Sequence, residues 1–85
     1  MLLADIRQAF LGNSRLPTRE LIARLSSLEE RPWGDYRDGS CISNKQLAKL
    51  LHLFGIKSTT FRQGDETPKG YVRADFEDAF DRYLP

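Results

Sequence analysis

The chain of 85 residues is long enough for one small domain, because chains divide into separate cores only at several times this length. Hydrophobic residues make up 40% of the chain and charged residues 29%, which indicates a folded globular domain and excludes a disordered one. The net charge of +1 identifies no class of partner, and no apolar run approaches the roughly 20 residues of a transmembrane helix.

The first predicted helix covers about residues 2–11, and Gly12-Asn13 indicates its end. Residues 15–17 follow as an extended segment that could form one brief strand, because the residue before Pro17 avoids helical backbone. The apolar residues of the helix recur at helical spacing: Leu3, Ile6 and Phe10.

The second predicted helix begins with Thr18 as its N-cap and ends at Pro32, which cannot continue a helix. Trp33 and Tyr36 follow in a turn. We expect these two aromatic side chains to cover one end of the core; the alternative is a platform on which nucleic-acid bases stack. The apolar stripe of the helix consists of Leu21, Ile22, Leu25 and Leu28.

The third helix carries the strongest local signals. Ser43 and Gln46 form a capping-box pattern at its start, and Gly55 suits a left-handed residue at its end. One face is predicted to be buried because its apolar residues follow the i, i+3, i+4, i+7 rule. These residues are Leu47, Leu50, Leu51 and Phe54.

Residues 57–62 and 70–73 are predicted to pair as an antiparallel hairpin with a mobile tip at 63–69. The last helix should run from about residue 74 to 84, with Phe76, Ala79, Phe80, Tyr83 and Leu84 as its apolar stripe. Its aspartates at positions 75, 78 and 81 could bind a cation, but no fourth ligand is implied. Gly12, Gly55 and Gly70 are interpreted as turn glycines rather than as a phosphate-binding loop.

This order of elements predicts a mainly α fold with a small β-hairpin, arranged as a winged helix-turn-helix in one domain over residues 1–85. In that architecture the third helix can enter the major groove of DNA, and the hairpin is the wing. The link from residue 31 to 42 is longer than the tight turn of the simplest helix-turn-helix.

Positive charge is concentrated in residues 41–73, which contain six basic and two acidic residues. In residues 1–40 the basic and acidic residues are equal in number, and residues 74–85 carry a net negative charge. A basic patch can follow DNA phosphates even when the whole chain is near neutral. The alternative is an ordinary solvated face. The predicted DNA-binding residues are Ser43, Asn44, Lys45, Lys49, His52, Lys57, Arg62 and Lys69.

The chain resembles the domain of unknown function near the C-terminus of phage- and plasmid-type primase/helicase proteins. The resemblance rests on Leu2-Leu3-Ala4-Asp5-Ile6-Arg7, Leu16-Pro17-Thr18, Glu20-Leu21, Leu28-Glu29-Glu30-Arg31-Pro32-Trp33, Gln46-Leu47-Ala48-Lys49-Leu50-Leu51, Phe54-Gly55-Ile56, Lys69-Gly70-Tyr71, Asp75-Phe76-Glu77-Asp78-Ala79-Phe80 and Arg82-Tyr83-Leu84-Pro85. It implies a C-terminal module of a mobile-element replication protein, with a nucleotide-binding motor domain as a neighbour.

The expected function is therefore non-enzymatic DNA binding, with duplex favoured over single strands. The chain contains no G-x-x-x-x-G-K-[ST] loop, so ATPase chemistry would lie elsewhere. One cysteine, Cys41, and one histidine allow no disulfide and no cysteine- or histidine-rich metal site, and no cofactor is expected. The lone cysteine and the absence of a signal-peptide pattern favour a cytoplasmic location without membrane contact. The alternatives are a winged helix that docks onto a protein, marked by an exposed apolar patch around Trp33, Tyr36 and Phe61, and a stand-alone transcription regulator.

Overall fold

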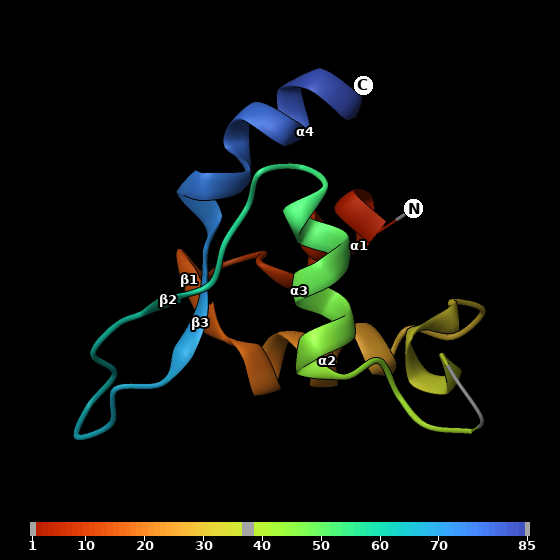
Figure 1. Ribbon diagram of the computed structural model, residues 1–85, viewed down its shortest axis with the longest axis horizontal. Coiled ribbons are helices and arrows are strands. Elements are labelled where there is room, and N and C mark those ends of the chain that lie inside the picture. The colour runs from red at the N-terminus through yellow and green to blue at the C-terminus, as the bar shows by residue number, and fades with distance from the viewer. Residues whose placement is uncertain (1, 37–38, 85) are drawn as a thin grey trace.

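The computed structural model describes residues 2–36 and 39–84, and within them the fold is mixed α/β (Figure 1). Part of the predicted link, residues 37–38, and the terminal Pro85 lie outside the described residues. Two short 3₁₀ segments, η1 (Pro32–Asp35) and η2 (Arg73–Phe76), accompany the main elements. These are α1 (Leu2–Ala9), β1 (Arg15–Pro17), α2 (Thr18–Ser26), α3 (Asn44–His52), β2 (Thr59–Thr60), β3 (Lys69–Val72) and α4 (Glu77–Tyr83).

The three strands form one antiparallel sheet in the order β1-β3-β2. The predicted hairpin is confirmed but is shorter than expected, because only Thr59 and Thr60 of β2 pair with β3. Beyond them, Gln63 and Glu66 exchange two backbone hydrogen bonds of 2.8 and 3.0 Å across the predicted tip. The predicted helices and hairpin are present, but the fold is mixed α/β rather than mainly α, because the brief strand expected at residues 15–17 pairs along β3 and adds a third strand to the sheet.

Gly70 lies in the middle strand and is not a turn glycine as predicted. It pairs with Pro17 on one side and with Thr59 on the other. A β-carbon at this position would meet the carbonyl oxygen of Leu16 and would approach Pro17 Cα and Phe61 Cε2 to 2.7 and 2.8 Å. Glycine is therefore required by the close approach of two strands and one ring.

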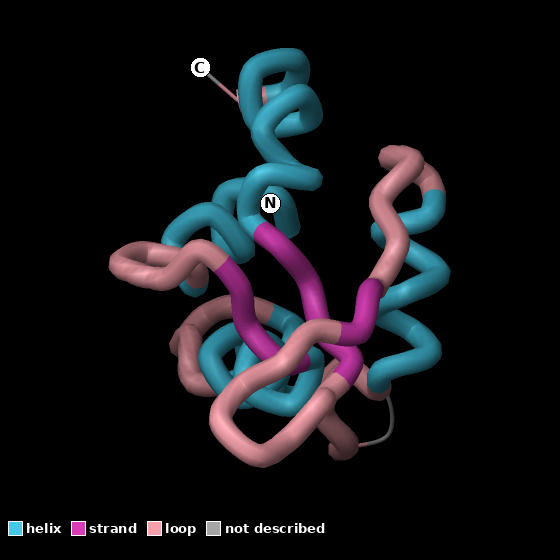
Figure 2. The backbone as a smooth tube through the Cα atoms, turned by 90° about the vertical axis from the view of Figure 1, so that its left-hand side faces the viewer, coloured by secondary structure: helices cyan, strands magenta, loops and turns pink. Residues whose placement is uncertain are grey.

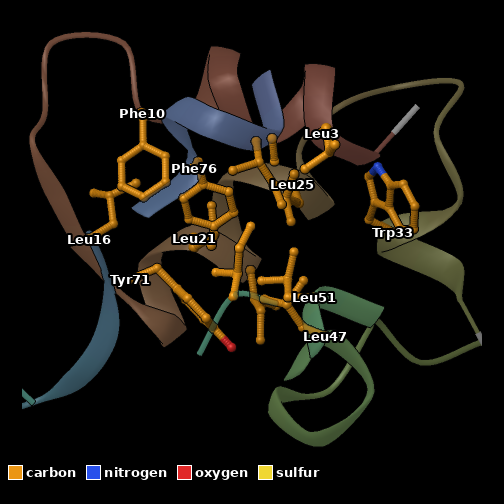
Figure 3. Close-up of a cluster of buried hydrophobic side chains, with 14 of the residues drawn as sticks. Leu3, Phe10, Leu16, Leu21, Leu25, Trp33, Leu47, Leu51, Tyr71 and Phe76 are labelled. Carbon is orange, nitrogen blue, oxygen red and sulfur yellow. The ribbon is translucent and has the colours of Figure 1, made fainter. Parts of the chain in front are cut away.

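The core lies between the sheet and the helices, and three aromatic contacts organise one end of it (Figure 3). The ring of Phe76 is 5.5 Å from Phe10, 6.0 Å from Tyr71 and 5.6 Å from Phe80, measured between centroids. Trp33 closes the opposite end of the cluster in Figure 3. The predicted burial of the apolar stripes of the first two helices is confirmed at Leu3, Ile6, Phe10, Leu21, Ile22 and Leu25. Phe10 lies directly after α1, which ends at Ala9, and Leu28 is only partly buried.

Helix α2 is shorter than predicted and has a different start. Pro17 occupies the N-cap position, and the hydroxyl of Thr18 instead donates a hydrogen bond of 3.2 Å to the carbonyl oxygen of Lys69. The helix ends at Ser26, before the predicted stop at Pro32. The hydroxyl of Ser27 donates to the carbonyl of Arg24 at 2.7 Å, a local bond of the kind by which serine competes with helical backbone.

Helix α3 begins as predicted, with both hydrogen bonds of the capping box between Ser43 and Gln46 present. Its buried face is narrower than expected, since Leu47 and Leu51 are fully buried whereas Leu50 and Phe54 are only partly buried against the core. The last predicted helix begins as η2 and becomes α-helical only at Glu77. Tyr83 was placed in its apolar stripe but is exposed, with its ring edge-on to Phe54.

The connection between α2 and α3 folds back on itself instead of forming a tight turn. The backbone N–H of Ile42 donates to the carbonyl oxygen of Trp33 at 2.8 Å, and that of Tyr36 donates to Ser40 at 2.8 Å. Trp33 is 8% exposed and its ring stacks on Tyr36 at 6.0 Å. The expectation that these aromatics cover one end of the core is therefore confirmed.

A buried carboxylate anchors this connection to α1. Asp5 is 3% exposed and accepts a hydrogen bond of 2.8 Å from the indole N–H of Trp33. The half-exposed Arg31 guanidinium lies 3.3 Å from the other carboxylate oxygen. Both oxygens of the carboxylate are thus partnered, as a buried charge requires.

Replacing Asp5 by alanine should lower the free energy of unfolding by about 1–3 kcal/mol, because it leaves the buried indole N–H without an acceptor. Asp5→Asn keeps an oxygen acceptor and should cost less. Urea unfolding followed by the fluorescence of the single tryptophan measures both. Asp81→Ala, which removes an exposed carboxylate, is the control; an Asp5→Ala variant as stable as that control would contradict the anchoring role.

Among the described residues, none of the helices has the length and apolar character needed to cross a membrane. In the same part of the chain, no group of three or more His, Cys, Asp or Glu side chains is placed to hold a metal ion. The three aspartates considered at the sequence level therefore do not converge with further ligands there, and Asp78 pairs with Arg82 at 3.3 Å.

Candidate nucleic-acid interface

The outward face of α3 carries the polar residues that the sequence singled out. Asn44, Lys45, Lys49 and His52 are all exposed, because Leu47 and Leu51 turn the opposite face into the core. The capping box holds the start of the helix in place, with the Ser43 hydroxyl accepting from the Gln46 N–H at 3.1 Å. Ser43 is therefore the N-cap of α3, the helix that carries the other four polar residues.

A hollow of about 340 Å³ brings part of α3 together with the hairpin. Asn44 and Lys45 line it from α3, and Lys69 lines it from β3. Acidic side chains are missing from this lining, as far as the described residues show, so two cationic groups and several polar groups face one concave surface. The remaining lining residues are Thr18, Ala48, Ser58 and Tyr71.

Two of the lining residues, Thr18 and Tyr71, connect this hollow to the core of the fold. Thr18 at the start of α2 bonds to the carbonyl oxygen of Lys69, which fixes the strand relative to the helix. Tyr71 lies beneath, and burial raises the pKa of its phenol above the ordinary value of 10.0. A tyrosine phenol is neutral at physiological pH even at its ordinary pKa, so Tyr71 leaves the positive charge of the two lysines uncompensated.

The other predicted residues are exposed but are not drawn into this hollow. Lys49 borders a second hollow of about 340 Å³ on the other flank of α3, together with Tyr36, Gln46, Leu50 and Leu53. His52 ends the helix, and Lys57 precedes β2. Arg62 follows β2, where its Nε donates to the Gly64 carbonyl at 3.4 Å.

Two arginines that lie near the hairpin were not among the predicted DNA-binding residues, because they belong to the charge-balanced part of the sequence. Arg15 of β1 lies over the ring of Phe61, 5.3 Å from its centroid. Arg19 of α2 pairs with Glu66 of the hairpin loop at 3.0 Å, with both side chains largely exposed. A prediction that β1 pairs with β3 would have placed Arg15 beside the hairpin, because paired strands lie next to each other in the sheet.

The apolar patch that would mark a protein-docking surface does not form around the expected residues. Trp33 is buried, and Tyr36 and Phe61 are partly buried. The large apolar side chains that are exposed in the described part of the chain lie elsewhere, namely Leu11, Leu53 and Tyr83. Because the Trp33 ring is buried, it cannot serve as the platform for stacking nucleic-acid bases that was the alternative prediction for this residue.

Comparison with known proteins places the chain among proteins without an assigned function. The family model described as "Protein of unknown function (DUF3631)" matches residues 1–83. The chain is 44% identical over 85 residues to a Saccharopolyspora erythraea protein described as "Uncharacterized 28.9 kDa protein in xis 5'region". That match covers 99% of the chain but 32% of the relative, so the chain spans about a third of the relative's length. No solved structure matches.

Proposed function

This chain belongs to the DUF3631 family of proteins of unknown function, and we propose that it is a winged helix-turn-helix module that binds duplex DNA and catalyses no reaction. The order of elements supports the proposal. A helix, a short strand, two further helices and a β-hairpin follow one another, and β3 of the hairpin lies between β1 and β2. In such an arrangement α3 is the helix presented to the major groove and the hairpin is the wing.

The hollow between α3 and the hairpin is the observation that carries the proposal. It joins Lys45 and Asn44 of the presented helix to Lys69 of the wing without an acidic residue in its lining. Lysines are suited to phosphates, and asparagine is suited to base edges. In Figure 1 the loop of the hairpin extends away from the helices, as a wing that follows a DNA backbone would.

The wider setting of the proposal is a mobile-element replication protein. The primase/helicase resemblance supports it, and so does the name of the relative, which refers to the xis 5′ region. That relative is about three times as long as the chain. In this setting the module supplies DNA contact, and a neighbouring nucleotide-binding motor domain supplies ATP hydrolysis.

The double variant Lys45→Glu/Lys49→Glu tests the proposal. Titration of a labelled duplex should give a Kd of about 10⁻⁴–10⁻⁶ M for the unaltered protein at physiological salt, as expected for non-specific binding. Reversing both charges should raise the Kd by about tenfold or more, because each lysine then repels the phosphates that it neutralised. Both side chains are exposed, so the melting temperature should be retained.

Arg7→Glu/Arg82→Glu is the matched control, since it also reverses two exposed cations on helices but outside α3 and the hairpin. It should change the Kd far less. Equal weakening by both double variants, or no binding by the unaltered protein at low salt, would overturn the proposal and leave protein docking as the alternative. A labelled single strand of the same sequence should bind more weakly than the duplex; tighter binding would overturn the assignment to duplex.

A further inference from the structure

Arg15 lies on the outer face of the sheet, away from the core. Successive side chains of a strand point to opposite faces, and the next residue, Leu16, is buried in the core opposite Tyr71. Figure 2 looks onto this outer face, and no helix crosses in front of the three strands. Arg15 therefore extends from a face of the sheet that the described helices leave open.

Phe61 holds the Arg15 side chain in position. Its ring lies against Gly70 in the middle strand, where a β-carbon would approach the ring to 2.8 Å. The Arg15 guanidinium carbon is 5.3 Å from the ring centroid, within the range of a cation–π contact. Such a contact uses the face of the ring, so the N–H donors of the guanidinium remain available to another acceptor.

Most other arginines in the described part of the chain already have acceptors. Carboxylates pair with the guanidinium groups of Arg19, Arg31 and Arg82 at 3.0–3.3 Å. Arg24 donates to the Ala9 carbonyl and to Asn13, and Arg62 donates to the Gly64 carbonyl. The Arg73 Nε lies 3.9 Å from a Glu77 carboxylate oxygen, too far for a hydrogen bond. Arg15 has no hydrogen-bond or ion-pair partner among the described residues. It is therefore a positioned guanidinium with unused donors, beside the basic hairpin.

We propose that the DNA-binding surface continues from α3 and the hairpin onto β1, where Arg15 contacts a backbone phosphate. This inference rests on the proposed function. A phosphate is the fitting acceptor, because a guanidinium can present two parallel N–H groups to its oxygens. Phe61 acts as a positioning residue, since it touches Arg15 and limits the conformations that this long side chain samples. The contact would widen the footprint of the module on one DNA strand.

The salt dependence of duplex binding tests this inference. In Arg15→Gln the slope of log K against log salt should fall by about 0.9, the share of one neutralised phosphate. Arg15→Lys keeps the charge and should keep the slope. Phe61→Leu keeps an apolar cover on Gly70 and the full charge, so it should weaken binding without changing the slope.

Arg7→Gln is the control, because Arg7 is also exposed and unpaired within the described residues but lies on α1. Its slope should equal that of the unaltered protein. If the unaltered protein binds and Arg15→Gln has the same slope as Arg7→Gln, the inference is wrong while the proposed function stands. If the unaltered protein does not bind the duplex at low salt, the proposed function itself fails.

Discussion

Replacing Phe76 by alanine should lower the free energy of unfolding by about 3–5 kcal/mol. The Phe76 side chain is fully buried, and its ring contacts those of Phe10, Tyr71 and Phe80 at once. Truncation removes this buried apolar area and leaves a cavity among side chains from β3, α4 and the turn directly after α1, and such a cavity can collapse only in part. A loss of this size is a large share of the roughly 5–15 kcal/mol that stabilises a typical domain.

Urea or thermal unfolding measures this loss, and Tyr83→Ala is the control. Tyr83 lies on the same C-terminal segment but is 52% exposed and makes one edge-on contact with Phe54. Its truncation should cost much less than that of Phe76. Equal costs for the two aromatic residues would contradict the central place of Phe76 in the core.

The variant Gly70→Ala should destabilise the protein by about 3 kcal/mol, at the upper end of the range for overpacking. The added methyl group would meet the Leu16 carbonyl oxygen and lie 2.7 Å from Pro17 Cα, and these are backbone atoms that cannot move aside as a side chain can. The pairing of β1 with β3 should therefore open. Amide exchange should become faster at Tyr71 and Arg73, whose N–H groups face β1, than in the rest of the sheet.

Gly64→Ala is the comparison that separates steric overlap from loss of glycine flexibility. Gly64 has a φ of 63°, a conformation that costs alanine about 1–2 kcal/mol, but a β-carbon there meets no atom within 4 Å. We expect it to be the milder of the two substitutions and to leave strand exchange unchanged. A Gly70→Ala variant no less stable than Gly64→Ala would mean that the strands can separate at little cost.

Much of the candidate interface was predictable because its signals are local. The start of α3 depends on Ser43 and Gln46, which are three residues apart, and the left-handed Gly55 lies only three residues after the helix ends at His52. Exposure of Lys45 and Lys49 follows from the position of Leu47 and Leu51 on the opposite face. The grouping of Asn44 and Lys45 with Lys69 was expected only in outline, since it depends on how the hairpin packs beside the helix.

The sequence by itself determined the order of the elements, the exposed polar face of α3 and the presence of a β-hairpin, because each depends on residues only a few positions apart. Tertiary structure alone decided the role of Gly70, the anchoring of Trp33 by Asp5, and the place of Arg15 over Phe61. Each of these contacts joins segments far apart in the chain. No local pattern encodes such a contact, because its geometry exists only once the sheet and helices have packed around a common core.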